Sequence, residues 1–259
     1  MSKKFVIMLV VLAFVFSLTA VVQAKPVLLQ YNLKKGDVVR YKIKMLSKTS
    51  LGYRGQIDKI DSESNLTMVQ RVIDKDEKTN VMYVLTSVEN VKTTVNGLPS
   101  SPAQQKAAER VFTMHIKPSG EIVDAQGLNG DMSMQQMQLS FPTKPVDVGS
   151  TWEHTIPAND KVKVPLNMKY VVKEFKKVKG HDCIVIKSTV ISKPKAKSNT
   201  PDSLDVKAEG EISFDYKTGQ IIQNKVKGNF GSVSIQDIGG KPEPVVTKVE
   251  VKLLMKLAK

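Results

Sequence analysis

Apolar and polar residues alternate with a period of two along most of this chain, and this pattern restricts the chain to β-strands. In residues 36–44, Val39, Tyr41 and Ile43 fall on one side of an extended backbone, and basic residues fall on the other. The same alternation returns near the C-terminus in residues 245–254. Because such a sheet has one apolar face that must be covered, the sequence predicts an all-β, mainly antiparallel fold with a few short helices.

Polar, turn-forming segments separate the predicted strands. They are 74–80, 117–120, 176–180 and 217–219. Glycine is the residue that tolerates tight turns and the starts of strands, where a side chain would be costly. We expect four glycines at such positions: Gly36, Gly120, Gly149 and Gly219.

The two halves of the chain contain similar blocks in the same order. Residues 36–43, 66–72, 81–88 and 111–124 resemble residues 149–156, 166–172, 183–190 and 211–224. This order predicts two related β-rich repeats of about five strands each, over 25–140 and 141–259. Residues 1–24, which precede them, are the expected signal peptide. The repeats could form a curved sheet, a half-barrel or a sandwich, and the sequence leaves open whether there is one continuous sheet or two packed sheets.

The triplet Trp152-Glu153-His154 contains the single tryptophan of the chain and looks at first like part of an active site. In the comparison of the halves, however, Trp152 matches Val39 and His154 matches Tyr41. A histidine that replaces a tyrosine on the apolar side of a strand indicates a packed residue rather than a general base. If the apolar face encloses a cavity, the candidate ligand-facing residues are Tyr41, Met68, Trp152, His154, Met168 and Phe214.

Two segments predict helices, and one predicts an exposed loop. Residues 100–111 have Ser101 in the N-cap position and Pro102 in the first turn. Residues 129–141 form the second predicted helix. The lysine-, proline- and serine-rich stretch 192–203 predicts an exposed loop, and residues 127–145 are the expected linker between the repeats.

The N-terminus has the features of a bacterial secretory signal. Two lysines precede an apolar run from Phe5 to Val22, and small residues lead to an expected cleavage after Ala24. Export to the periplasm or cell surface is therefore expected, and an uncleaved inner-membrane anchor is the alternative. Cys183 is the only cysteine, so it has no partner for an internal disulfide.

The formal net charge of +14 comes mainly from lysines that are spread along the strands. Lysines on the solvent face of strands discourage edge-to-edge aggregation. Attraction to an anionic envelope polymer or to a membrane surface stays open. Nucleic acid is not expected as a partner, because only four basic residues are arginines and aromatic residues are few.

Three clusters suggest chemistry but have simpler interpretations. Met132, Met134 and Met137 could bind Cu(I), or fill an apolar interface. The acidic segment 74–78 resembles the start of a calcium loop but lacks its later ligands, which favours a hairpin tip. His181 and Cys183 could form a nucleophilic pair, but a buried thiol is favoured. We therefore expect no catalytic residue, no cofactor and no metal.

Three stretches resemble an uncharacterised family of exported bacterial β-rich proteins that carries a domain-of-unknown-function label. They are residues 33–43, the spaced residues Pro145, Val148, Gly149 and Trp152, and residues 120–127. The resemblance implies an exported β-rich architecture and no known activity. The expected fold is also similar to the half-barrels of periplasmic lipoprotein carriers, which is an analogy of fold alone.

Two functions follow as hypotheses. The first is a non-enzymatic binding or scaffold protein of the bacterial envelope that carries a lipid or another apolar ligand. The second is an envelope hydrolase that acts on anionic polymers with two facing carboxylates. The sequence does not specify the ligand, and it leaves enzymatic activity and the oligomeric state undetermined.

Overall fold

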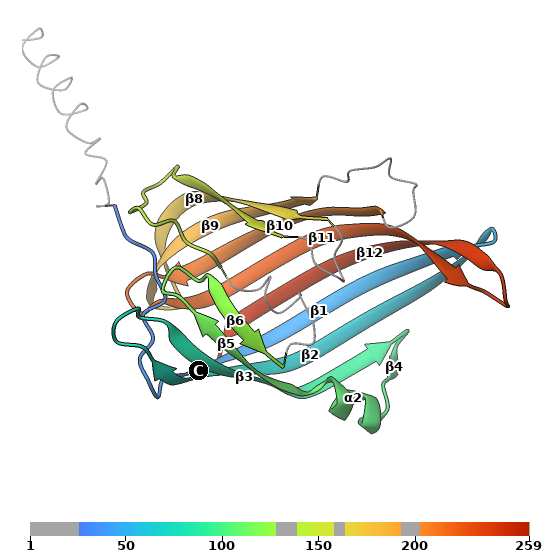
Figure 1. The fold of residues 1–259 in the computed structure, drawn as a ribbon, viewed down its shortest axis with the longest axis horizontal. Coiled ribbons are helices and arrows are strands. Elements are labelled where there is room, and N and C mark those ends of the chain that lie inside the picture. The colour runs from blue at the N-terminus through green and yellow to red at the C-terminus, as the bar shows by residue number, and fades with distance from the viewer. Residues whose placement is uncertain (1–25, 128–138, 158–163, 193–202, 259) are drawn as a thin grey trace, which may run out of the picture.

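The computed structural model describes residues 26–127, 139–157, 164–192 and 203–258, and these form one antiparallel sheet with a single short helix (Figure 1). The sheet has twelve strands, in the order β6-β5-β3-β2-β1-β12-β11-β10-β9-β8-β7, with β4 paired to β3. The prediction of an all-β, mainly antiparallel fold is confirmed.

The strands of the N-terminal part are β1 (Val38–Tyr53), β2 (Gln56–Lys75), β3 (Met82–Val95), β4 (Leu98–Pro99), β5 (Arg110–Ile116) and β6 (Ile122–Gln126). Those of the C-terminal part are β7 (Thr151–Ile156), β8 (Leu166–Val178), β9 (His181–Ser192), β10 (Ser203–Asp215), β11 (Gln220–Asp237) and β12 (Pro242–Leu257). The helix α2 (Pro102–Ala108) is capped by Ser101, as predicted.

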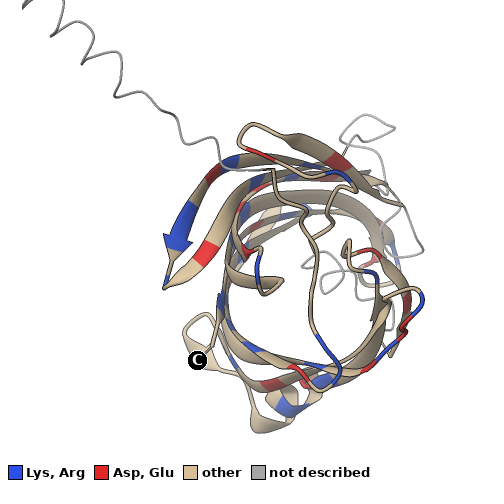
Figure 2. Cartoon of the chain, turned by 90° about the vertical axis from the view of Figure 1, so that its left-hand side faces the viewer, with Lys and Arg blue, Asp and Glu red and all other residues tan. Residues whose placement is uncertain are grey.

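The sheet is continuous across its centre and open at its edges. The first strand pairs with the last over Tyr41↔Leu257 to Gly52↔Val246, and β12 also pairs with β11. The edge strands β6 and β7 do not pair with each other in the described part of the chain, so the sheet is strongly curved but not closed. Figure 2, which looks along the strands, shows this curvature. Two packed sheets, the other arrangement that the sequence left open, are thereby excluded.

Burial follows the alternation in the sequence. Val39, Tyr41 and Ile43 of β1 are at most 5% exposed and face inward, whereas Arg40 and Lys42 face the solvent. The inner faces of the strands together form one apolar core. The pattern of β1 is therefore the inside-outside pattern of the whole sheet.

Corresponding features recur in the two halves. The amide of Gly36 donates to the carbonyl of Val72 at 2.8 Å, and the amide of Gly149 donates to the carbonyl of Val172 at 3.0 Å. Directly after these two valines, β2 and β8 each carry a β-bulge against the next strand. The duplication itself stays a prediction, but these turns and bulges fall where the matched blocks place them.

Two segments outside the sheet close one end of the curved inner face, and we call residues 26–33 and 139–146 the plug. They pair with each other through Val27 and Val146. They also bond to the β5–β6 turn, because Tyr31 donates its amide to Pro118 and Phe141 donates to Ser119. The rings of Tyr31 and Phe141 pack on Phe214 of β10, with centroids 5.7 and 4.6 Å from its ring. The plug is thus anchored to both halves of the sheet.

Several predictions concern segments that lie largely outside the described residues. Residues 1–24, most of the predicted helix 129–141 and most of the predicted loop 192–203 belong to this group. The described end of the predicted helix, residues 139–141, is not helical and belongs to the plug. The predicted linker 127–145 therefore contributes to the core through Leu139 and Phe141 instead of only joining the repeats.

Candidate ligand-binding cavity

A cavity of about 290 Å³ lies on the inner face of the C-terminal half of the sheet, next to the plug. Its walls come from β8, β9, β10, β11 and β12, with Met45 from β1 and Ile156 from β7. Leu139 of the plug lines it at one end. Most lining side chains are apolar: Met45, Leu139, Ile156, Leu166, Met168, Val190, Val206, Ala208, Ile212, Val226, Phe230, Val251 and Leu253.

Small residues at inward positions of β10 and β11 explain why the core is incomplete here. Ala208 of β10 pairs with Gly228 of β11, and Gly210 of β10 pairs with Ser188 of β9, so small residues lie side by side on three strands. A glycine inside a strand weakens it, since it offers no side chain to pack, and often marks a close approach of another group or a ligand. The small residues therefore leave space on the inner face while the hydrogen-bonded ladder continues unbroken past them.

Three uncharged polar side chains also line the cavity, those of Tyr170, Ser188 and Asn224. Ser188 and Asn224 are both 6% exposed, and the Oδ1 atom of Asn224 is buried without a hydrogen-bond partner among the described residues. The hydroxyl of Tyr170 donates to the Sδ atom of Met168 at 3.4 Å. Burial raises the pKa of Tyr170, so this hydroxyl stays protonated at neutral pH. The cavity thus combines an apolar wall with a few buried polar atoms, as small-molecule sites do.

The structure separates the six candidate ligand-facing residues. Only Met168 lines the cavity. Tyr41, Met68 and Phe214 are buried in the core.

Trp152 and His154 are half-buried on the same side of β7. The ring of Trp152 stacks on Tyr170 with centroids 5.1 Å apart, and its Nε1 atom donates to the carbonyl of Ser140 in the plug. His154 lies opposite Met168 in the pairing with β8. The structure thus places both residues in packed positions beside the cavity wall.

Most of the cavity wall was missed from the sequence. Asn224, Ser188, Gly210 and Gly228 were not among the candidates. The available signal was the run of small and polar residues at alternate positions of 206–212 and 224–230, which interrupts an otherwise apolar face.

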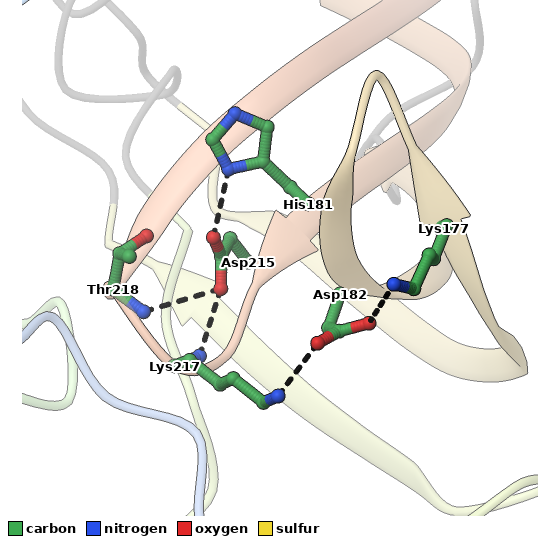
Figure 3. Close-up of polar contacts among 6 residues, drawn as sticks. All are labelled: Lys177, His181, Asp182, Asp215, Lys217 and Thr218. Carbon is green, nitrogen blue, oxygen red and sulfur yellow. Dashed lines mark hydrogen bonds and ion pairs between the residues drawn. The ribbon is translucent and has the colours of Figure 1, made fainter.

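A second polar cluster lies at the ends of β8–β11 on the side of the plug (Figure 3). His181 Nδ1 lies 2.9 Å from Oδ2 of Asp215, and Oδ1 of Asp215 accepts hydrogen bonds from the amides of Lys217 and Thr218. Lys217 Nζ lies 2.6 Å from Asp182. Burial alone would raise the pKa of Asp215, but the hydrogen bonds from His181, Thr218 and Lys217 outweigh it, and the pKa is lowered. Asp215 thus remains ionised and stabilises the turn.

Cys183 lies close to this cluster and is 1% exposed. Burial, with a further contribution from the charge of Asp215, raises the pKa of its thiol to about 11. The buried thiol that the sequence favoured is confirmed. Because the thiolate is the reactive form, the alternative of a nucleophilic pair with His181 is not supported.

We expect native protein at pH 8 to react with a maleimide at least about a hundredfold more slowly than protein unfolded in urea, since both burial and the raised pKa suppress the thiolate. Stopped-flow or mass-spectrometric labelling measures both rates on the one cysteine. Equal rates in the two states would show that Cys183 is accessible.

The other sequence clusters have structural roles where they are described. Asp76 accepts hydrogen bonds from the amides of Lys78 and Thr79, so the acidic segment 74–78 forms a hairpin tip, as favoured. Met132, Met134 and Met137 lie outside the described residues. Within the described ranges, no three His, Cys, Asp or Glu side chains are grouped so that they could hold a metal ion.

Comparisons with known proteins match one family model over part of the chain and give no activity. Residues 131–221 match a family of unknown function (DUF6263), which confirms over this range the resemblance to a family without known activity. A search of curated proteins found no match. Within 26–127, 139–157, 164–192 and 203–258, no helix is long and apolar enough to cross a bilayer.

Two solved structures show a distant likeness. A candidate exported protein with a YmcC-like fold from Bacteroides fragilis shares 10% identity, with 90% of this chain and 100% of that chain covered and a TM-score of 0.30. A DUF1329 family protein from Desulfovibrio piger shares 12% identity, with 86% of each chain covered and a TM-score of 0.16. TM-scores this low establish neither a common fold nor a common function.

Proposed function

We propose that this chain is an exported, non-enzymatic binding protein of the bacterial envelope that carries a mostly apolar ligand in the cavity of its curved sheet. The cavity carries the proposal, because it is lined by apolar side chains from seven strands and the plug. Its volume of about 290 Å³ is close to the lower limit of ordinary small-molecule pockets, about 300 Å³. Voids of this size are rare in packed cores, which are filled almost as densely as organic crystals.

Native mass spectrometry of the mature protein from its own host tests this proposal. A co-purifying mass that organic solvent removes is the expected result. A bare monomer mass, together with no uptake of added apolar ligands, would contradict the proposal and favour a surface role for the protein. The same spectrum tests export, since cleavage after Ala24 leaves a chain that begins at Lys25.

Filling the cavity should weaken ligand binding without damaging the fold. We expect Ala208→Leu to lower the affinity for apolar ligands at least about tenfold, because the added carbons occupy the space of the ligand. The same change should stabilise the ligand-free protein by about 1–2 kcal/mol, since it buries further apolar atoms in empty space. Isothermal titration calorimetry and urea unfolding measure the two effects.

Lys207→Leu is the matched control, because the neighbouring residue on the same strand is exposed on the outer face. This control should leave both affinity and stability close to those of the unmodified protein. If Ala208→Leu binds ligands as well as the control does, the ligand is not in this cavity.

The alternative hydrolase needs one carboxylic acid that stays protonated near neutral pH, next to a second carboxylate. Every described carboxyl group with a shifted pKa has it lowered: Glu63, Asp74, Asp76, Glu109, Asp182 and Asp215. No observation therefore favours the hydrolase over the carrier.

The outer face of the sheet favours a weak interaction with an anionic polymer or membrane surface rather than a strong one. Its lysines alternate with carboxylates on neighbouring strands, and Lys187–Glu209 and Lys225–Glu211 lie 3.3 and 3.8 Å apart. Exposed pairs of this kind add little stability, but they reduce the positive potential of the face.

A further inference from the structure

One buried atom of the cavity has no hydrogen-bond partner among the described residues. Asn224 lies on the inner face of β11, opposite Ile212 of β10 and Met255 of β12. The residue is 94% buried, because only 6% of its surface is exposed, and its Oδ1 atom accepts no hydrogen bond from any described residue. An unpaired buried acceptor forfeits the hydrogen bonds that it would make in water, so it is normally satisfied by protein, by water or by a ligand.

The surroundings of Asn224 show what kind of group could satisfy it. Oδ1 is an acceptor, so the partner must donate a hydrogen bond. Ser188 offers a second polar atom in the cavity wall, and its Oγ lies over Gly210, only 2.4 Å from where a Cβ atom of that glycine would be. Gly210 lies on β10, between β9 and β11. Because it has no side chain, it leaves room for the Ser188 hydroxyl, which lines the cavity.

The charges around the cavity argue against an ionised ligand group. Among the described lining residues, the only charged one is Glu209, which is exposed and forms an ion pair with Lys187. A buried carboxylate or ammonium group on the ligand would have no opposite charge, and burial of an unpaired charge is strongly unfavourable. The donor is thus an uncharged group.

We propose that the cavity binds a single-chain alkyl compound that carries one uncharged hydroxyl group, with this hydroxyl donating to Oδ1 of Asn224. The inference rests on the proposed carrier function and adds the chemical class of the ligand. The alkyl chain lies against the apolar wall formed by Ala208, Val226 and Phe230. The small volume, about 290 Å³, fits one chain rather than a lipid with two.

Three uncharged probes of equal size test the hydroxyl requirement: 1-octanol, methyl heptyl ether and nonane. Calorimetry on the mature protein should show 1-octanol binding about tenfold more tightly than the ether, because one additional hydrogen bond raises an affinity by about this factor. Octanoate at pH 7 should bind more weakly than 1-octanol, since the cavity offers no positive charge.

Asn224→Leu is the decisive variant, because leucine keeps a similar size and removes the acceptor. It should lose the preference for 1-octanol over the ether and should bind nonane more tightly than either, because the oxygen of both probes would then be buried without a donor or acceptor. It should also be at least as stable as the unmodified protein, since the unpaired acceptor is gone. Ser188→Ala should retain the preference for 1-octanol over the ether, which distinguishes the acceptor from its neighbour.

The outcomes separate the inference from the proposed function. Binding of nonane and the ether as tightly as 1-octanol would overturn the hydroxyl requirement and leave the carrier function intact. Equal binding of 1-octanol and the ether, both above nonane, would show that Asn224 presents its amide nitrogen and would also overturn it. Octanoate binding as tightly as 1-octanol would contradict the argument from charge. If none of the probes binds and no host ligand co-purifies, both proposals are wrong.

Discussion

Gly219→Ala is expected to destabilise the protein by at least about 3 kcal/mol, the largest effect of any single methyl group that we predict. Gly219 has φ of +72° in the β10–β11 turn, and an added Cβ atom would lie 2.2 Å from the amide nitrogen of Asn32 in the plug. Backbone of the plug cannot move away as a flexible side chain could. The variant must therefore detach the plug or distort the turn.

Gly120→Ala should behave in the same way, because its Cβ atom would lie 2.0 Å from the carbonyl oxygen of Leu139. Gly180→Ala is the matched control, since Gly180 has φ of +89° and nothing within 4 Å of the added atom. This control isolates the cost of the left-handed conformation, about 1–2 kcal/mol. Urea unfolding, followed by the fluorescence of Trp152, measures the stability of all three variants. Trp152 is a suitable reporter because it is hydrogen-bonded to the plug. Equal losses in all three variants would show that the plug does not press on these turns.

Asp215→Ala is expected to cost about 2–3 kcal/mol at pH 7, because it removes a buried acceptor that serves His181 and two backbone amides. The pKa of Asp215 is lowered in the folded protein. A carboxyl group with a lowered folded pKa adds stability above its unfolded pKa, about 3.9, and loses it as the pH falls through the folded value. The difference in the free energy of unfolding between the variant and the unmodified protein should therefore become smaller below about pH 4.

Asp237→Ala provides the control for this experiment. Asp237 also accepts a hydrogen bond from a turn amide, that of Gly240, but it is exposed and has no histidine partner. Its loss should cost about 1 kcal/mol or less. If the loss of stability in Asp215→Ala stays constant from pH 7 to pH 3, the charge of Asp215 does not contribute to the stability of the fold.

The sequence predicted the strands and turns well, because alternation and turn residues are local signals. Val39, Tyr41 and Ile43 face inward as expected. Gly120 and Gly219 lie in the β5–β6 and β10–β11 turns, also as expected. Neither signal shows what approaches a turn from elsewhere in the chain. The plug was therefore not predicted, although its backbone lies against Gly120 and Gly219 and is the reason that neither position tolerates a side chain.

The cavity was predicted only as a possibility, and its position was not predicted. The candidates were chosen from the inner face of matched strands, and among them Phe214 packs in the core against the plug. A cavity arises where large side chains are missing, so small residues at inward positions, such as Ala208 and Gly210, were the better signal. Which strands face one another across the curve depends on long-range pairing, which the sequence of one chain does not reveal.

The pairing of β1 with β12 has a consequence for how the sheet folds. Strand β12 is the last of the described strands along the chain, yet it lies at the centre of the sheet between β1 and β11. The other neighbouring strands of the sheet are adjacent or nearly adjacent in the chain, so they can pair locally. The pairing of β1 with β12 alone closes a loop over nearly the whole described chain, and we expect this long-range contact to be the slow step that joins two separately formed meanders.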